Sequence, residues 1–131
     1  MSSTTPITVP AQAIDTLEIQ LAGRVVRPAD ADYDAVRAVW NGMIDRRPAF
    51  VVRCAKTADV VAAVNFARDQ RVPFSVRGGG HNVSGSAVID GGMVIDLSEM
   101  RNVLVNPRDK SIRVEGGATW ADVDQMTQRY G

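Results

Sequence analysis

The stretch Arg77-Gly78-Gly79-Gly80-His81-Asn82-Val83-Ser84-Gly85 follows a short apolar strand and contains the only histidine of the chain. Consecutive glycines let the backbone adopt conformations closed to other residues and approach a ligand closely. Successive backbone N–H groups turned inward by such a loop bind anions, phosphate above all. The stretch therefore predicts a phosphate-binding loop that carries a nucleophilic, titratable imidazole.

The residues before this loop have the pattern of a strand, a helix and a second strand. Phe50-Val51-Val52 is typical of a buried strand, and Phe74-Ser75-Val76 forms the second strand. Between them a helix is expected that Thr57 caps, with its apolar face at Val60, Ala63, Val64 and Ala67. Residues 49–77 have about the length of a βαβ unit, whose right-handed crossover makes its two strands parallel. The glycine loop then follows the carboxyl end of a strand, where ligands bind in open α/β sheets.

Other segments predict the elements around this unit. Periodicity indicates a helix over residues 12–21 and another from about Asp32, with one apolar stripe made of Tyr33, Val36, Val39, Trp40 and Met43. Beyond the loop, Val88-Ile89 and Met93-Val94-Ile95 flank a tight-turn signal at Asp90-Gly91-Gly92. A second hairpin is expected around residues 106–110, and a final helix from the Thr119-Trp120-Ala121-Asp122 capping box.

The composition excludes several classes of partner. Fifteen basic residues balance fifteen acidic ones among 131, so neither nucleic acid nor an anionic membrane is an expected partner. No apolar run has transmembrane length. The first 23 residues contain neither Lys nor Arg and no apolar core, which argues against a secretory signal. The lone Cys54 is interpreted as a small buried hydrophobe, and a reducing, cytoplasmic location is expected.

Familiar phosphate-binding motifs do not match the loop. Gly80 and Gly85 have the spacing of a P-loop, but Ser86 stands where a lysine is required. A dinucleotide fingerprint would need a third glycine in place of Val83. Both motifs also lead into a helix, whereas this loop leads into strand-like sequence.

Three further interpretations concern the loop and the residues beside it. A hydrolytic pair of His81 with Ser84 or Ser86 remains open but ranks low, because neither serine lies in a G-x-S-x-G elbow. No metal site is expected, since the chain has too few ligands. Arg77 has two equal interpretations, a cation beside the bound anion or an ordinary charge at a strand end.

Several motifs occur together in a characteristic order over about residues 28–131. They are the Arg77–His81 stretch with Gly85, Val94-Ile95-Asp96-Leu97-Ser98, Gly116-Gly117-Ala118-Thr119-Trp120, the helix start at residues 57–61, and residues 40–48. In this order they resemble the flavin-dependent oxidases with a PCMH-type (vanillyl-alcohol-oxidase-like) FAD-binding domain, in the berberine-bridge-enzyme-like branch. The resemblance implies an α+β fold: the N-terminal part of such a domain, with a βαβ unit followed by a small, mostly antiparallel sheet region and flanking helices.

The resemblance also implies roles for individual residues. The glycine loop would hold the FAD pyrophosphate through Gly78, Gly79, Gly80, Asn82 and Gly85, with Arg77 beside it. His81 would bond covalently to the 8α-methyl carbon of the flavin, a reaction that suits a nucleophilic imidazole. Gly117 and Ala118 would supply backbone near the flavin, although glycines that serve only packing explain that pair equally well.

The resemblance further implies that part of the machinery is missing. Family members are several times longer, and their catalytic base lies in the absent part, so no catalytic residue is assigned here. We expect residues 1–27 to form an N-terminal extension with a short helix, and residues 28–131 to form an incomplete N-terminal portion of the FAD-binding domain. The expected function is that of an FAD-dependent oxidoreductase, with a small-molecule substrate and dioxygen as partners of the complete enzyme. The alternative is a non-catalytic, truncated module that binds a nucleotide or phosphate.

Overall fold

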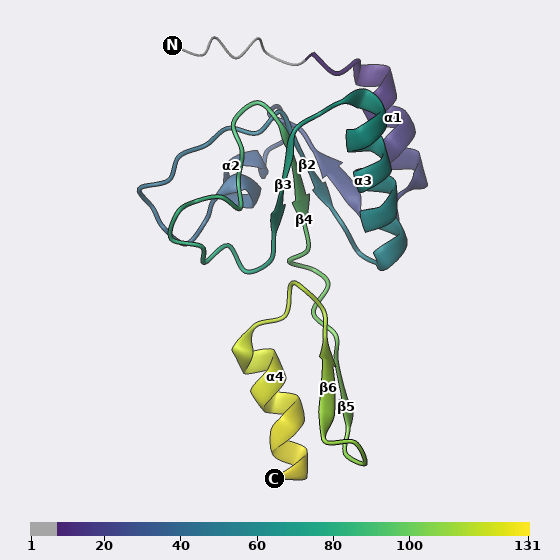
Figure 1. Cartoon of the computed structure of the whole chain (residues 1–131). Coiled ribbons are helices and arrows are strands. Elements are labelled where there is room, and N and C mark those ends of the chain that lie inside the picture. Colours follow the sequence, from purple (N-terminus) through teal and green to yellow (C-terminus); the bar gives the residue numbers. More distant parts are fainter. Residues whose placement is uncertain (1–7) are drawn as a thin grey trace.

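A four-stranded sheet forms the core of the larger part of the molecule, for which a computed structural model describes residues 8–131 (Figure 1). Its strands are β1 (Arg24–Val26), β2 (Phe50–Arg53), β3 (Phe74–Arg77) and β4 (Met93–Asp96), in the order β1-β2-β4-β3. β1 is antiparallel to β2, whereas β2, β4 and β3 are parallel. The parallel βαβ unit predicted from the sequence is confirmed, and β4 lies between its two strands.

Two helices cover one face of this sheet. α1 (Ala11–Gln20) and α3 (Thr57–Gln70) lie side by side (Figure 1). Leu17 of α1 packs in the same core as Phe50 and Val52 of β2. Because successive side chains of a strand point to opposite faces, Val51 of β2 instead belongs to a second core on the other face of the sheet.

The predicted helix over residues 12–21 is confirmed by α1. It packs against α3, and β1 pairs with β2, so residues 11–26 share the core of the sheet. The loose start expected at Ser2–Pro6 lies outside the described residues. The domain boundary near residue 27 stays a prediction.

The predicted length of the second helix is wrong. α2 (Tyr33–Arg37) has only five residues, because the chain turns extended at Ala38. Tyr33 and Val36 are buried as expected, but Trp40 is 69% exposed and Met43 is 92% exposed. The apolar stripe thus ends with α2, and residues 38–47 form a loop.

The hairpin predicted around Asp90-Gly91-Gly92 is also wrong. The N–H of Gly91 donates to the carbonyl of Arg47, and the N–H of Arg47 donates to the Asp90 carboxylate at 2.7 Å. These contacts hold the turn against the residues that precede β2. The chain then enters the sheet between β2 and β3, where β4 finds two parallel partners instead of one antiparallel neighbour.

A hairpin and a helix make up the C-terminal part. β5 (Val103–Asn106) and β6 (Ser111–Val114) pair antiparallel, as predicted, and α4 (Trp120–Thr127) continues into a 3-10 turn over Gln128–Tyr130. The predicted capping box is confirmed, since Thr119 and Asp122 exchange hydrogen bonds between side chain and backbone. Figure 1 shows this part beyond the carboxyl end of β4.

The start of α3 is held by a buried carboxylate and not by the predicted cap. Thr57 is the first helical residue, and no side chain caps the residue before it. Instead the carboxylate of Asp59 accepts hydrogen bonds from the N–H groups of Ala22, Gly23 and Ala55 at 2.8–2.9 Å. Burial by itself raises the pKa of Asp59, but these backbone hydrogen bonds outweigh it and hold the pKa below its ordinary value of 3.8. Asp59 thus ties the α1–β1 connection to α3.

The variant Asp59→Asn should lose about 2 kcal/mol of unfolding free energy at pH 7, because an amide nitrogen leaves buried donors unpaired. A lowered folded-state pKa gives stability that is present above the unfolded-state pKa and is lost as pH falls through the folded-state pKa. The difference between wild type and variant should therefore shrink below about pH 4. Urea unfolding at pH 7 and pH 3 measures both effects, with the exposed Asp69→Asn as control. A difference that does not depend on pH would contradict this role.

Cys54 is fully buried at the end of β2. Burial, together with the negative charges of Asp59 and Asp96, raises the pKa of its thiol to about 12. The interpretation of Cys54 as an inert core residue agrees with this environment. Among residues 8–131, no helix combines the length and the apolar character needed to cross a bilayer.

Candidate functional site

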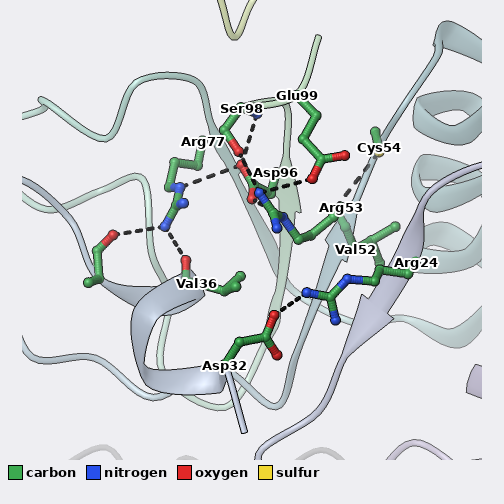
Figure 2. A network of polar contacts seen from close by, with 11 residues as sticks. Arg24, Asp32, Val36, Val52, Arg53, Cys54, Arg77, Asp96, Ser98 and Glu99 are labelled. Carbon is green, nitrogen blue, oxygen red and sulfur yellow. Dashed lines mark hydrogen bonds and ion pairs between the residues drawn. The ribbon is translucent and has the colours of Figure 1, made fainter. Parts of the chain in front are cut away.

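Three charged residues meet where the parallel strands end. Arg53, Asp96 and Arg77 are the last residues of β2, β4 and β3, and the strand register places both arginines directly opposite Asp96. Figure 2 shows the guanidinium groups converging on this buried carboxylate, with Nε–Oδ distances of 3.2 Å from Arg53 and 3.5 Å from Arg77. The network fixes the edge of the sheet from which the glycine loop begins.

The guanidinium group of Arg77 is bound by other groups of the protein. Its side chain is mostly buried, and its guanidinium donates to the carbonyl oxygens of Val36 and Ala38 as well as pairing with Asp96. These contacts favour the interpretation of Arg77 as a structural residue at the strand end. They also explain why α2 stops at Arg37, because a tertiary donor binds the carbonyl groups on either side of this residue.

The glycine loop is compact and closely packed on its inner side. Gly80 and Gly85 both have φ of +73°, in the left-handed region that glycine adopts without strain. A Cβ atom on Gly78 would lie 2.5 Å from the carbonyl oxygen of Gly116, so the two glycine motifs of the sequence are in contact. The Asn82 side chain stays within the loop, accepting hydrogen bonds from the backbone and hydroxyl of Ser84.

The loop retains free hydrogen-bond donors. Within the described part of the chain, no protein acceptor takes the backbone N–H groups of residues 79–83. A run of such donors in a glycine-rich loop is an anion-binding arrangement. The site therefore can hold a phosphate or pyrophosphate group through the main chain alone.

A cavity of about 660 Å³ opens beside this loop. Gly79 and His81 line it on one side, Ile112 and Val114 of β6 on another, and residues 118–121 with Val123 of α4 on the third. Its walls are largely apolar, and its volume is typical of a small-molecule site. The predicted residues Gly79, His81 and Ala118 are thus brought together around one cavity.

Other predicted residues lie outside the cavity wall. Gly117 is buried against the backbone of Leu97, which favours its interpretation as a packing glycine. Gly85 packs against Ile44 on the inner side of the loop. The sequence prediction missed Trp120, which lines the cavity and is 80% exposed; its position directly after the second glycine motif was the available signal.

The His81 imidazole is exposed and stacks on an indole. The ring centroids of His81 and Trp40 are 5.8 Å apart and their planes differ by 19°. Gly79 also contacts the imidazole, since a Cβ atom there would lie 3.3 Å from Cδ2 of His81. No sequence pattern predicted the stack, because residues 40 and 81 meet only through the tertiary structure.

Residues 48–131, more than half of the chain, match the family described as FAD binding domain. The chain belongs to this family. The match begins just before β2 and takes in the glycine loop, α4 and every residue that lines the cavity. Trp40 and the other contacts from residues 36–44 lie before it.

Relatives of this FAD-binding domain are oxidoreductases. An FAD-linked oxidoreductase of Bacillus subtilis is 38% identical over 86% of the chain and 25% of its own length. The crystal structure of 6-hydroxy-D-nicotine oxidase from Arthrobacter nicotinovorans is 34% identical, with a TM-score of 0.80 over 85% of the chain and 24% of the oxidase. A BBE-like protein of Physcomitrella patens shares the fold, with a TM-score of 0.82 over 90% of the chain at 22% identity.

These findings confirm the family and the α+β fold expected from the sequence motifs. The chain spans about a quarter of the length of the relatives it matches.

Proposed function

We propose that this chain is the flavin-attaching part of an FAD-dependent oxidase. The observation that carries the proposal is that the loop with free N–H donors and the apolar cavity share two residues, Gly79 and His81. The residues fit the cofactor, because the main chain suits the pyrophosphate and the apolar wall suits a flat ring. His81 stands between the two. Relatives named as an FAD-linked oxidoreductase and an oxidase support this assignment.

In this proposal the free N–H groups of residues 79–83 would hold the pyrophosphate, and His81 would tether the ring. When bound, FAD accepts a hydride from a carbon atom of a small-molecule substrate and passes its electrons to dioxygen. The role of this chain is to bind and orient. Ala118 and Trp120 would form a wall for the ring, and the apolar side chains of β6 would exclude water.

The tether would be a bond between an imidazole nitrogen of His81 and the 8α-methyl carbon of the flavin. This bond would replace one methyl C–H bond and the imidazole N–H bond. Dioxygen would take up the two hydrogens and two electrons as hydrogen peroxide, so no further co-reactant is needed. The exposed imidazole of His81 would supply the nucleophile.

The test is whether the flavin stays attached to the polypeptide when the protein is denatured. The natural gene product that contains this sequence should be yellow, and its colour should remain with the polypeptide after acid precipitation. A flavin-containing band should also fluoresce on a denaturing gel. If all of the flavin stays in the supernatant, the covalent tether is wrong, while the assignment to the FAD-binding family stands.

A further inference from the structure

Residues 38–47, called here the supporting segment, lie against the inner side of the glycine loop. The backbone N–H of Trp40 donates to the carbonyl of Gly80 at 3.0 Å. The Asn41 amide donates to the carbonyl of Val83 at 3.2 Å. One guanidinium nitrogen of Arg46 donates to the carbonyls of Gly85 and Val88 at 2.9 and 3.0 Å. Donors of the supporting segment thus bind the loop at carbonyl oxygens on its inner side.

These contacts determine which way the loop presents its donors. In a trans peptide the C=O and the following N–H point in opposite directions. Because Trp40 binds the carbonyl of Gly80, the N–H of His81 points away from the supporting segment. The loop can therefore offer this donor to an anion only while the carbonyl behind it is held.

Trp40 makes a second contact with the same part of the loop through its side chain. Its indole stacks on the His81 imidazole, at a separation within the usual range for aromatic pairs. The indole is 69% exposed and belongs to neither core of the sheet, so the stack is not a by-product of core packing. The backbone on either side is anchored, by Arg77 at Ala38 and by Ile44 against Gly85.

We propose that Trp40 is a positioning residue for His81, which orients the imidazole for attachment to the flavin. This inference rests on the proposed function and extends it to a residue outside the matched family segment. An exposed histidine on a glycine loop would otherwise sample several staggered side-chain rotamers. The indole restricts the imidazole to one ring plane, and bond formation depends steeply on such alignment.

The variant Trp40→Leu tests the stack by itself, because the backbone N–H that holds Gly80 is retained. The natural gene product that contains this sequence is prepared without flavin, FAD is added, and acid-stable flavin is followed with time. We expect Trp40→Leu to lower the rate of flavin attachment by on the order of 10-fold or more. Trp40→Phe should keep this rate within about 3-fold of that of the wild type. Met43→Leu, in the same segment and 92% exposed, should attach at the wild-type rate.

A second measurement separates positioning from structural support. Non-covalent FAD affinity, measured in a His81→Ala background with and without Trp40→Leu, should change less than about 3-fold, because the loop donors stay in place. Attachment at the wild-type rate in Trp40→Leu would overturn the inference. So would a parallel loss of attachment and affinity in both Trp40→Leu and Trp40→Phe, because that pattern indicates structural support. Acid-stable flavin in His81→Ala would instead overturn the proposed function.

Discussion

Replacing His81 by alanine is expected to release all of the flavin from the denatured polypeptide. His81 is the only histidine of the chain, and its imidazole lines the cavity beside the loop donors. Without it, no nucleophile of the loop stands in for the ring nitrogen, and flavin is held only through non-covalent contacts. Acid precipitation followed by absorbance of pellet and supernatant measures the result.

The effect of this substitution should be chemical and not structural. Because His81 is exposed, we expect its replacement to change the free energy of unfolding by less than about 0.5 kcal/mol. Ser86→Ala, at an exposed position just after the glycine loop, is the matched control and should retain acid-stable flavin. Flavin that stays in the His81→Ala pellet would show that another residue forms the bond.

Replacing Gly117 by alanine should have the largest effect on folding. A Cβ atom at this position would lie 1.8 Å from the carbonyl oxygen and 2.6 Å from the carbonyl carbon of Leu97. Both atoms belong to the backbone, so no side-chain rotation relieves the clash. The N–H of Gly117 also donates to the carbonyl of Met100 at 3.0 Å, and separating the two backbones would break this bond. We expect a loss of about 3 kcal/mol in unfolding free energy.

The same substitution should also weaken FAD binding. Gly117 lies between β6 and α4, and its close contact with Leu97 holds α4 and the cavity wall near the glycine loop. Gly42→Ala is the control, because a Cβ atom there meets no neighbour within 4 Å. Urea unfolding and flavin titration measure the two effects. Stability of Gly117→Ala equal to that of Gly42→Ala would show that the backbone contact is absent in solution.

Much of the local structure could be predicted because it depends on neighbouring residues. β2 and α3 follow from apolar runs and helical spacing, and the capping box of α4 follows from Thr119 and Asp122. The β5–β6 hairpin follows from alternation around a turn. The glycine loop was recognised for the same reason, since three glycines before one histidine form a local signal that needs no partner elsewhere.

Where the structure differs from the sequence prediction, the cause is a contact between residues that are far apart in the sequence. The Val88–Ile95 region has the pattern of a hairpin, yet β4 enters the sheet between β2 and β3 because that place offers two parallel partners. The apolar stripe after Asp32 has helical spacing, yet α2 ends at Arg37, where Arg77 binds the carbonyl groups of Val36 and Ala38. Backbone hydrogen bonds with tertiary partners outweigh weak local preferences in both places.

The features of the candidate site also fall into those that the local sequence specifies and those that depend on tertiary contacts. By itself the sequence determined the glycine loop, the single imidazole and the family, because these depend on residue type and order along the chain. Only the tertiary structure decided that Arg77 faces Asp96, that β6 and α4 close a cavity beside His81, and that Trp40 stacks on the imidazole. The residues that meet in these features are up to some forty positions apart in the sequence. Their geometry is therefore set by how the elements at the edge of the sheet pack together.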